Sequence, residues 1–272
     1  MLVLLLGLLN GAGAAELQPV VDTTLAVTSW RTGVQADLRY GARLPLFEKE
    51  DNPLFQGTGL KALGTLALTP SYVRAGGRLT FSPLAIFDVH VHGGVDRYFG
   101  NFDTMVGYDD PSANPGSTEE IAERVEASGN RAAGGGFHVG AQAVVKLKVG
   151  PVIVLSSLDV VHWDENAELD GDWYFEREKE VLLRLGGDQS LDGNLLLLYQ
   201  HDLSEDRWVR GGSFTTMRTG VGADDRLLRS GVLASLGGGA TSHSLIVQPY
   251  LISRSYEMTS PPYVAYAFKY AK

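Results

Sequence analysis

The stretch Val34-Gln35-Ala36-Asp37-Leu38-Arg39-Tyr40-Gly41-Ala42-Arg43-Leu44-Pro45-Leu46 decides the fold. Its even positions are all apolar, whereas its odd positions as far as Arg43 are Gln, Asp, Arg, Gly and Arg. Successive side chains of a strand point to opposite faces, so this segment has one apolar and one charged face. The alternation outlasts the about five or six residues of an ordinary strand and reaches the about 9–11 that a membrane-crossing strand needs.

Similar alternation returns along the chain and predicts twelve strands, an even number that places both chain ends on one side. From residue 82 onward short connections alternate with longer ones, as periplasmic turns alternate with extracellular loops. We therefore predict an all-β fold, a transmembrane antiparallel up-and-down barrel of about 12 strands, or of ten if 20–30 and 60–69 are misread. The predicted strands are 20–30, 34–46, 60–69, 72–82, 84–99, 137–149, 152–163, 173–186, 191–202, 227–236, 244–254 and 263–270.

The first residues have the pattern of a secretory signal. An apolar run from Met1 to Leu9 is followed by small residues up to Ala15, although the usual basic residues before the run are missing. We expect residues 1–15 to be a cleaved signal peptide and residues 16–272 to form a single barrel domain. No other stretch approaches the about 18 apolar residues of a membrane helix.

Composition narrows the classes of function. The chain has no cysteine, so it cannot form disulfides, and its 33 glycines suit a protein of strands and turns. A net charge of −9 argues against nucleic acid as a partner, because that function needs a basic footprint. Mean hydropathy near zero fits strands whose two faces average out.

The last strand carries a resemblance. Tyr266, Phe268 and Tyr270 alternate near the C-terminus, although Ala271 and Lys272 follow where an aromatic residue usually ends the chain. In this the sequence resembles the broad class of bacterial outer-membrane β-barrel proteins, porin-like and Gram-negative. The resemblance implies an outer-membrane location, insertion by the barrel assembly machinery, and contact with outer-membrane lipids and lipopolysaccharide. An exported soluble β-sandwich or lipocalin-like barrel stays open, because a period of two does not tell which face is inside.

Residues 100–132 interrupt the strands as one long loop. Ser117 and Glu120 have the spacing of a capping box, and Ile121 and Val125 lie four apart, which predicts a short helix with one apolar face. Long loops with an element of their own are often functional, although a solvated surface excursion is the favoured explanation of the pattern.

The charged faces predict a polar lumen that carries both signs of charge. Twelve strands lie between filled eight-stranded barrels and open porins, so a narrow passive channel for small solutes is the predicted function. A filled structural barrel without transport is the alternative. We expect Arg74 and Arg78 on one wall and three glutamates on a distant strand. The predicted lumen residues are Arg39, Arg74, Arg78, Asp88, His90, His92, His138, Lys146, Asp159, Glu176, Glu178 and Glu180.

The sequence gives little support for catalysis or for metal binding. No cofactor is indicated, no residue is singled out as catalytic, and no Gly-x-Ser-x-Gly elbow occurs, so an outer-membrane lipid-modifying enzyme is a further alternative only. Two sets of residues are candidate metal ligands, although a polar lumen network and a solvated acidic loop explain them as well. These candidates are His90, His92 and His138, and Asp164, Glu168 and Asp170.

Overall fold

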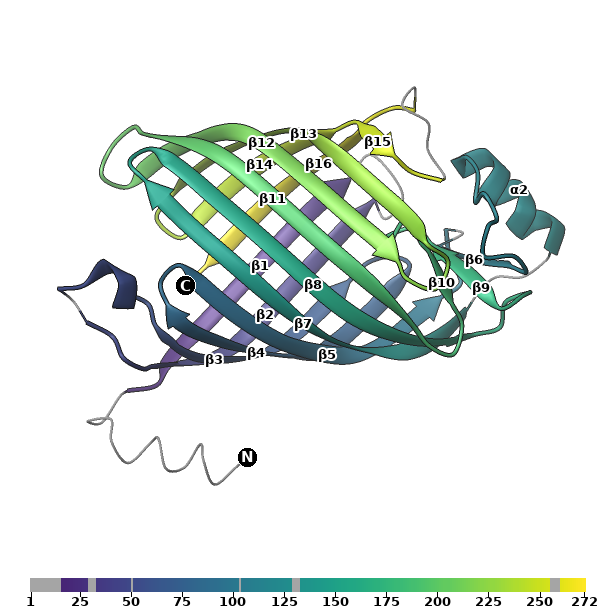
Figure 1. Cartoon of the computed structure of the whole chain (residues 1–272), viewed down its shortest axis with the longest axis horizontal. Coiled ribbons are helices and arrows are strands. Elements are labelled where there is room, and N and C mark those ends of the chain that lie inside the picture. Colours follow the sequence, from purple (N-terminus) through teal and green to yellow (C-terminus); the bar gives the residue numbers. More distant parts are fainter. Residues whose placement is uncertain (1–15, 29–32, 50, 103, 129–132, 255–259) are drawn as a thin grey trace.

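The computed structural model describes residues 16–28, 33–49, 51–102, 104–128, 133–254 and 260–272. Within this part of the chain, twelve antiparallel strands close into a barrel, because β1 pairs with β16 and β12 pairs with β13 (Figure 1). One of the twelve is split into β14 and β15 at Pro249, which has no N–H to give to the sheet. The strands are β1 (Gln18–Thr28), β2 (Val34–Pro45), β3 (Gly59–Leu68), β4 (Tyr72–Leu84), β5 (Phe87–Phe99), β7 (Ala133–Val149), β8 (Val152–Ala167), β11 (Asp188–Asp202), β12 (Arg207–Gly220), β13 (Asp225–Gly238), β14 (Thr241–Gln248) with β15 (Tyr250–Ile252), and β16 (Tyr263–Ala271).

The apolar faces point outward. Val91, Val95 and Val139 expose 53%, 62% and 49% of their surface, whereas Asp96 and His138 on the same two strands are buried. A belt of exposed apolar side chains around a charged interior is stable only in lipid, so the barrel spans a membrane. The soluble alternative, which needs an apolar interior and a charged exterior, is wrong for this chain.

The predicted strand number is confirmed, but one strand was misplaced. Residues 173–186 were predicted to cross the membrane and instead form a short hairpin, in which Glu180 has a left-handed φ of 59°. The true ninth strand, β12, lies within 203–225, which was read as a polar connection. Its outward face carries small and hydroxyl residues such as Gly211, Ser213 and Thr215, so the alternation was hidden. The ten-strand alternative is wrong, since β1 and β3 both form.

The two ends of the barrel differ. Both described ends of the chain lie at one end of the barrel, where most connections are short and the connection 46–58 carries the turn η1 (Pro53–Phe55) (Figure 1). The long connections 100–132 and 168–187 lie at the opposite end, which we call the loop end. Short connections at one end and long ones at the other are typical of outer-membrane barrels, whose turns are periplasmic and whose loops are extracellular.

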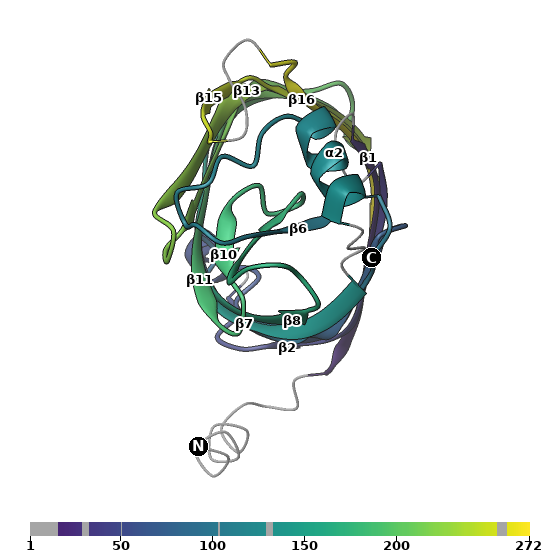
Figure 2. The same cartoon turned by 90° about the vertical axis from the view of Figure 1, so that its right-hand side faces the viewer.

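The two long connections fold together at the loop end. They form a three-stranded sheet in the order β10-β9-β6, and the predicted helix α2 packs beside it, so that these elements lie across the barrel when it is viewed from this end (Figure 2). Ser117 and Glu120 exchange the two hydrogen bonds of the predicted capping box, at 2.6 and 3.3 Å. No helix in the described ranges is long and apolar enough to cross a membrane. The elements are β6 (Met105–Tyr108), α2 (Thr118–Ser128), β9 (Trp173–Glu176) and β10 (Leu182–Arg184).

The orientation of the faces can be tested by charge. Val91→Arg should lower the free energy of unfolding by about 2–4 kcal/mol, because the arginine would face lipid near the bilayer midplane. Gln142→Arg should cost less, because Gln142 lies on the inward face of β7 and contacts Asp159. Urea unfolding in lipid vesicles measures both values. A larger loss for Gln142→Arg than for Val91→Arg would contradict the assignment of the faces.

Candidate functional site

A charged turn lies inside the barrel near the loop end. We call residues 173–184 the insert; it consists of β9, the turn and β10. In the turn region Glu176, Lys179 and Glu180 are almost fully buried. Burial of a charge is costly unless it is paired and hydrogen-bonded, so the partners of these side chains decide whether the insert stays in place.

Lys179 joins the insert to β8. Its Nζ lies 3.2 Å from Glu176 Oε2 within the insert and 3.3 Å from Glu165 Oε1 on β8. It also donates to the Tyr98 hydroxyl at 3.3 Å and lies 3.9 Å from the centre of the Trp163 ring. Burial alone would lower the pKa of Lys179, but the surrounding groups, Glu176 and Glu165 among them, hold it well above its ordinary value. Lys179 is therefore a charged anchor.

The opposite side of the turn is bound as well. Glu180 accepts from the Tyr250 hydroxyl at 3.0 Å and pairs with Arg229 Nη1 of β13 at 2.9 Å. Arg218 of β12 donates to the backbone oxygens of Glu178 and Lys179 at 2.9 and 2.7 Å. The turn is thus bound to strands on several sides of the barrel.

The third contact corrects a prediction. Arg74 of β4 lies 3.2 Å from Glu178 Oε2 and also pairs with Asp96. Burial would raise the pKa of Glu178, but Arg74 together with Tyr72, Lys179 and Arg218 outweighs burial, and the pKa is lowered. Glu176, Glu178 and Glu180 therefore occupy the lumen from the insert and not from a strand of the wall. The expected separation of a basic and an acidic wall is wrong, since Arg74 and Glu178 form an ion pair.

Apolar packing completes the closure of the loop end. Val181, Leu182 and Leu183 are fully buried, and Leu183 packs in a cluster with aromatic residues of the wall. Leu182 belongs to a second cluster that contains Ile121 of α2, the residue whose helical spacing predicted an apolar face. The insert is thus packed between the wall and α2.

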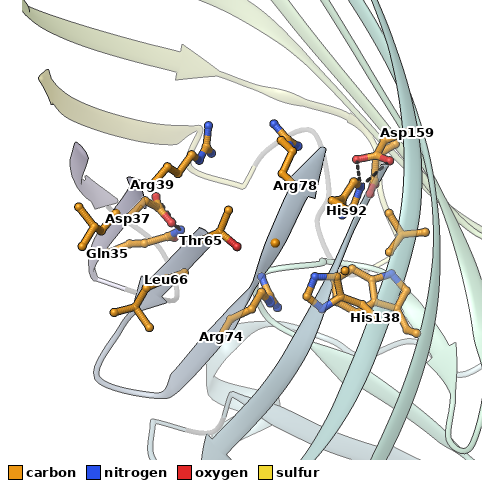
Figure 3. A pocket seen from close by; sticks show the side chains of 17 residues that line it. Gln35, Asp37, Arg39, Thr65, Leu66, Arg74, Arg78, His92, His138 and Asp159 are labelled. Carbon is orange, nitrogen blue, oxygen red and sulfur yellow. Dashed lines mark hydrogen bonds and ion pairs between the residues drawn. The ribbon is translucent and has the colours of Figure 1, made fainter. Parts of the chain in front are cut away.

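A charged cavity of about 290 Å³ remains in the lumen beside the insert (Figure 3). His92 Nε2 lies 3.0 Å from Asp159 Oδ1, and His138 Nδ1 lies 2.8 Å from Asp96 Oδ2. Six of the predicted lumen residues line this cavity: Arg39, Arg74, Arg78, His92, His138 and Asp159. The alternation of the strands was sufficient to find them.

Three cations of the lumen do not take part in these ion pairs and hydrogen bonds. Arg39, Lys61 and Arg78 lie on the inward faces of the adjacent strands β2, β3 and β4. Within the part of the chain that the structure describes, none of the three has an ion pair or a side-chain hydrogen bond. Arg39 and Arg78 both line the cavity and point toward the same side of it (Figure 3). We call these three residues the basic strip.

The remaining predicted residues are distributed along the wall. Lys146 Nζ pairs with Asp88 Oδ2 at 2.7 Å, and His90 Nδ1 lies 2.7 Å from Thr80 Oγ1. His90, His92 and His138 thus have different partners, and in the described ranges no three His, Asp or Glu side chains converge as metal ligands would. Of the acidic stretch, Asp164 lies on β8, while Glu168 and Asp170 lie in the connection after it.

Sequence reasoning missed several residues of the site. Arg218 was hidden because β12 was not recognised, and Arg229 because its strand was predicted without a lumen role. Lys179 was overlooked because it lies between glutamates in a segment taken for a wall strand. One signal in the sequence could have identified Lys179. The run Glu176-Arg177-Glu178-Lys179-Glu180 is charged on both faces, which a lipid-facing strand does not tolerate.

Comparison with known proteins agrees with the fold. No protein-family model and no curated protein sequence matches the chain. Among solved structures, the chain is similar to the β domain of the Bordetella autotransporter Brka, with a TM-score of 0.51 and 9% identity over 93% of this chain and 98% of that one. It is also similar to LpxR from Salmonella typhimurium, with a TM-score of 0.46 and 8% identity over 92% of this chain and 99% of that one. The likeness to the Brka domain shows the fold alone, which is that of bacterial outer-membrane β-barrels. With its apolar belt, the protein is an outer-membrane barrel.

The contribution of the Lys179 ion pairs to the free energy of unfolding can be measured. Lys179→Met should lower the free energy of unfolding by about 3–5 kcal/mol, because it leaves Glu165 and Glu176 buried without their cation. Adding Glu165→Gln and Glu176→Gln should restore much of the loss. Arg226→Gln removes an ion pair that is exposed to solvent and should change stability by less than about 1 kcal/mol. Equal losses for Lys179→Met and Arg226→Gln would contradict the role of Lys179.

Proposed function

We propose that the protein is an outer-membrane conduit for small solutes that the insert closes at the loop end. The observation that carries the proposal is the lumen beside the insert, where a cavity of about 290 Å³ is lined by Arg39 and Arg78, which have no ion-pair partner in the described residues. A barrel that served only as a filled scaffold would gain from packing this space or from pairing these charges.

The manner in which the insert is held supports closure that can be released. Its turn is bound to the wall largely by ion pairs and hydrogen bonds, including Arg74 with Glu178 and Arg229 with Glu180. Such contacts can be exchanged for contacts with water when the turn leaves the lumen, which buried apolar contacts cannot. The insert also begins and ends at one place, since Leu185 N donates to Asp172 O at 2.8 Å. It can therefore move without a change in the twelve strands of the barrel, provided that β9 separates from β6 or moves together with it.

The enzyme alternative receives less support. Thr80 and His90 form the hydroxyl–imidazole pair of the lumen, but within the described ranges no carboxylate is hydrogen-bonded to His90. On the outer face His243 Nδ1 lies 2.6 Å from the Tyr266 hydroxyl. Neither arrangement supplies the three groups of a nucleophile, a base and an orienting acid.

Conductance in planar bilayers tests the conduit. The intact protein should show small or rare openings, and replacement of residues 173–184 by a short Gly-Ser linker should give large, persistent ones. Because Arg39 and Arg78 then face open water, the current should prefer anions, and the preference should shrink at molar salt, where the Debye length is about 3 Å.

Two controls make the result decisive. The same linker in place of residues 52–56, at the end with the termini, should leave the conductance as in the intact protein. Lys179→Met, which loosens the insert without shortening the chain, should raise the frequency of opening. A shortened barrel that folds, as circular dichroism would show, and yet never conducts would support the filled structural barrel instead.

A further inference from the structure

An apolar surface lines the lumen on the side opposite the basic strip. On β11 both faces are apolar from Leu195 to Leu198: Leu195 and Leu197 face lipid, whereas Leu198 is 93% buried in the interior, with 7% exposed. The interior of a barrel of this class is ordinarily polar, so these inward residues need a reason. We call the following residues the apolar wall: Leu155 on β8, Leu196 and Leu198 on β11, Phe214 on β12, Leu233 on β13 and Ile246 on β14.

The register makes the apolar wall continuous. Leu196 pairs with Leu155 on one side and with Phe214 on the other, and Leu233 pairs with Ile246. None of these residues belongs to the two apolar clusters that pack the insert in the described part of the chain. The apolar wall therefore does not serve to hold the insert.

The apolar wall faces the basic strip. In the ring of twelve strands β12 lies six strands from β3 in either direction, so the two surfaces lie on opposite sides of the lumen. On β12, Phe214 is closer to the end with the termini than Arg218, which binds the insert. On β4, Arg78 is likewise closer to that end than Arg74. Both surfaces thus lie in the part of the lumen that the insert leaves unoccupied.

The acidic groups of the cavity are mostly engaged elsewhere. Asp159 contacts His92, and Asp192 pairs with Arg218. Asp37 has only the neutral Gln35 amide, at 3.1 Å, as its hydrogen-bonded partner in the described residues. In the described residues none of these carboxylates forms an ion pair with a cation of the basic strip.

We infer that this part of the lumen binds an amphipathic anion, a molecule with one linear alkyl chain and a carboxylate or sulfate head. Arginine binds such heads through paired, charge-assisted hydrogen bonds, which Arg39 and Arg78 can offer from neighbouring sides of the cavity. The alkyl chain lies along the apolar wall, where its removal from water favours binding. The inference deepens the proposed function, since it names a solute class for the conduit.

Equilibrium binding of a fluorescent long-chain fatty acid, cis-parinaric acid, tests the site. The protein is placed in nanodiscs of neutral lipid, and the signal of empty discs is subtracted. We expect saturable binding of one probe per barrel. Palmitate should displace the probe, whereas hexadecanol, which lacks the charge, and acetate, which lacks the chain, should not.

Variants separate the head from the chain. Arg39→Gln with Arg78→Gln should weaken binding at least about tenfold, as expected for the loss of charge-assisted hydrogen bonds. Leu196→Ser with Phe214→Ser should weaken it similarly, and Asp37→Asn should strengthen it. Arg226→Gln, on the exposed loop end, should leave it unchanged. Circular dichroism confirms that each variant is folded.

The inference is overturned by any of three results: no saturable signal above empty discs, unchanged affinity in the double arginine variant, or equal displacement by hexadecanol. Binding is measured with the insert in place and needs no current. A barrel that binds the probe but never conducts would therefore remove the conduit and keep the site. A barrel that conducts after shortening but does not bind would remove the site alone.

Discussion

The structure depends on the pairing of charges buried within the barrel. Lys179 is surrounded by Glu176, Glu165 and aromatic rings, and the neighbouring glutamates meet arginines of the wall. Because each of these charges would be costly if left alone in the interior, they hold the turn and the wall in one arrangement. The position of the insert, the closure of the loop end and the shape of the remaining cavity all follow from this network.

The lumen consequently has two parts with different physical character. Toward the loop end it is filled by the insert, and apolar packing against α2 reinforces the ion pairs. Toward the termini it keeps unpaired cations on β2–β4 and apolar side chains on β8–β14, with no insert between them in the described chain. A surface that is basic on one side and apolar on the other is unusual for a simple scaffold, and it gives the proposed conduit both a barrier and a chemical preference.

Much of the fold could be predicted from the sequence, because a lipid-facing strand must alternate. The alternation from Val34 to Leu46 distinguishes an apolar face from a charged face. The same alternation predicts that Arg39, His92, His138 and Asp159 point inward. The rule failed where it was not the controlling constraint. The outward face of β12 holds Gly211, Ser213 and Thr215, which weakens the pattern, and the insert alternates by chance although it never touches lipid.

The partners of the site could not be predicted, because they depend on the path of the long connections. Nothing in the local sequence tells that residues near 178 return into the lumen and meet Arg74, more than a hundred residues earlier in the chain. The capping box at Ser117 is the opposite case, since its two hydrogen bonds join residues three apart. Hydrogen bonds between residues close in the sequence could be predicted, whereas ion pairs between residues far apart in the sequence could not. The predicted signal peptide, residues 1–15, lies outside the described residues.

The most direct test of the closed loop end is the accessibility of one lumen position from that end. The chain has no cysteine, so Thr65→Cys places a single thiol in the cavity. On intact cells, a membrane-impermeant maleimide dye too bulky for general porins should fail to label this thiol, and should label it once residues 173–184 are replaced by a linker. Ser112→Cys, on the exposed part of the long loop, should be labelled in both backgrounds. Equal labelling of Thr65→Cys with and without the insert would contradict the account.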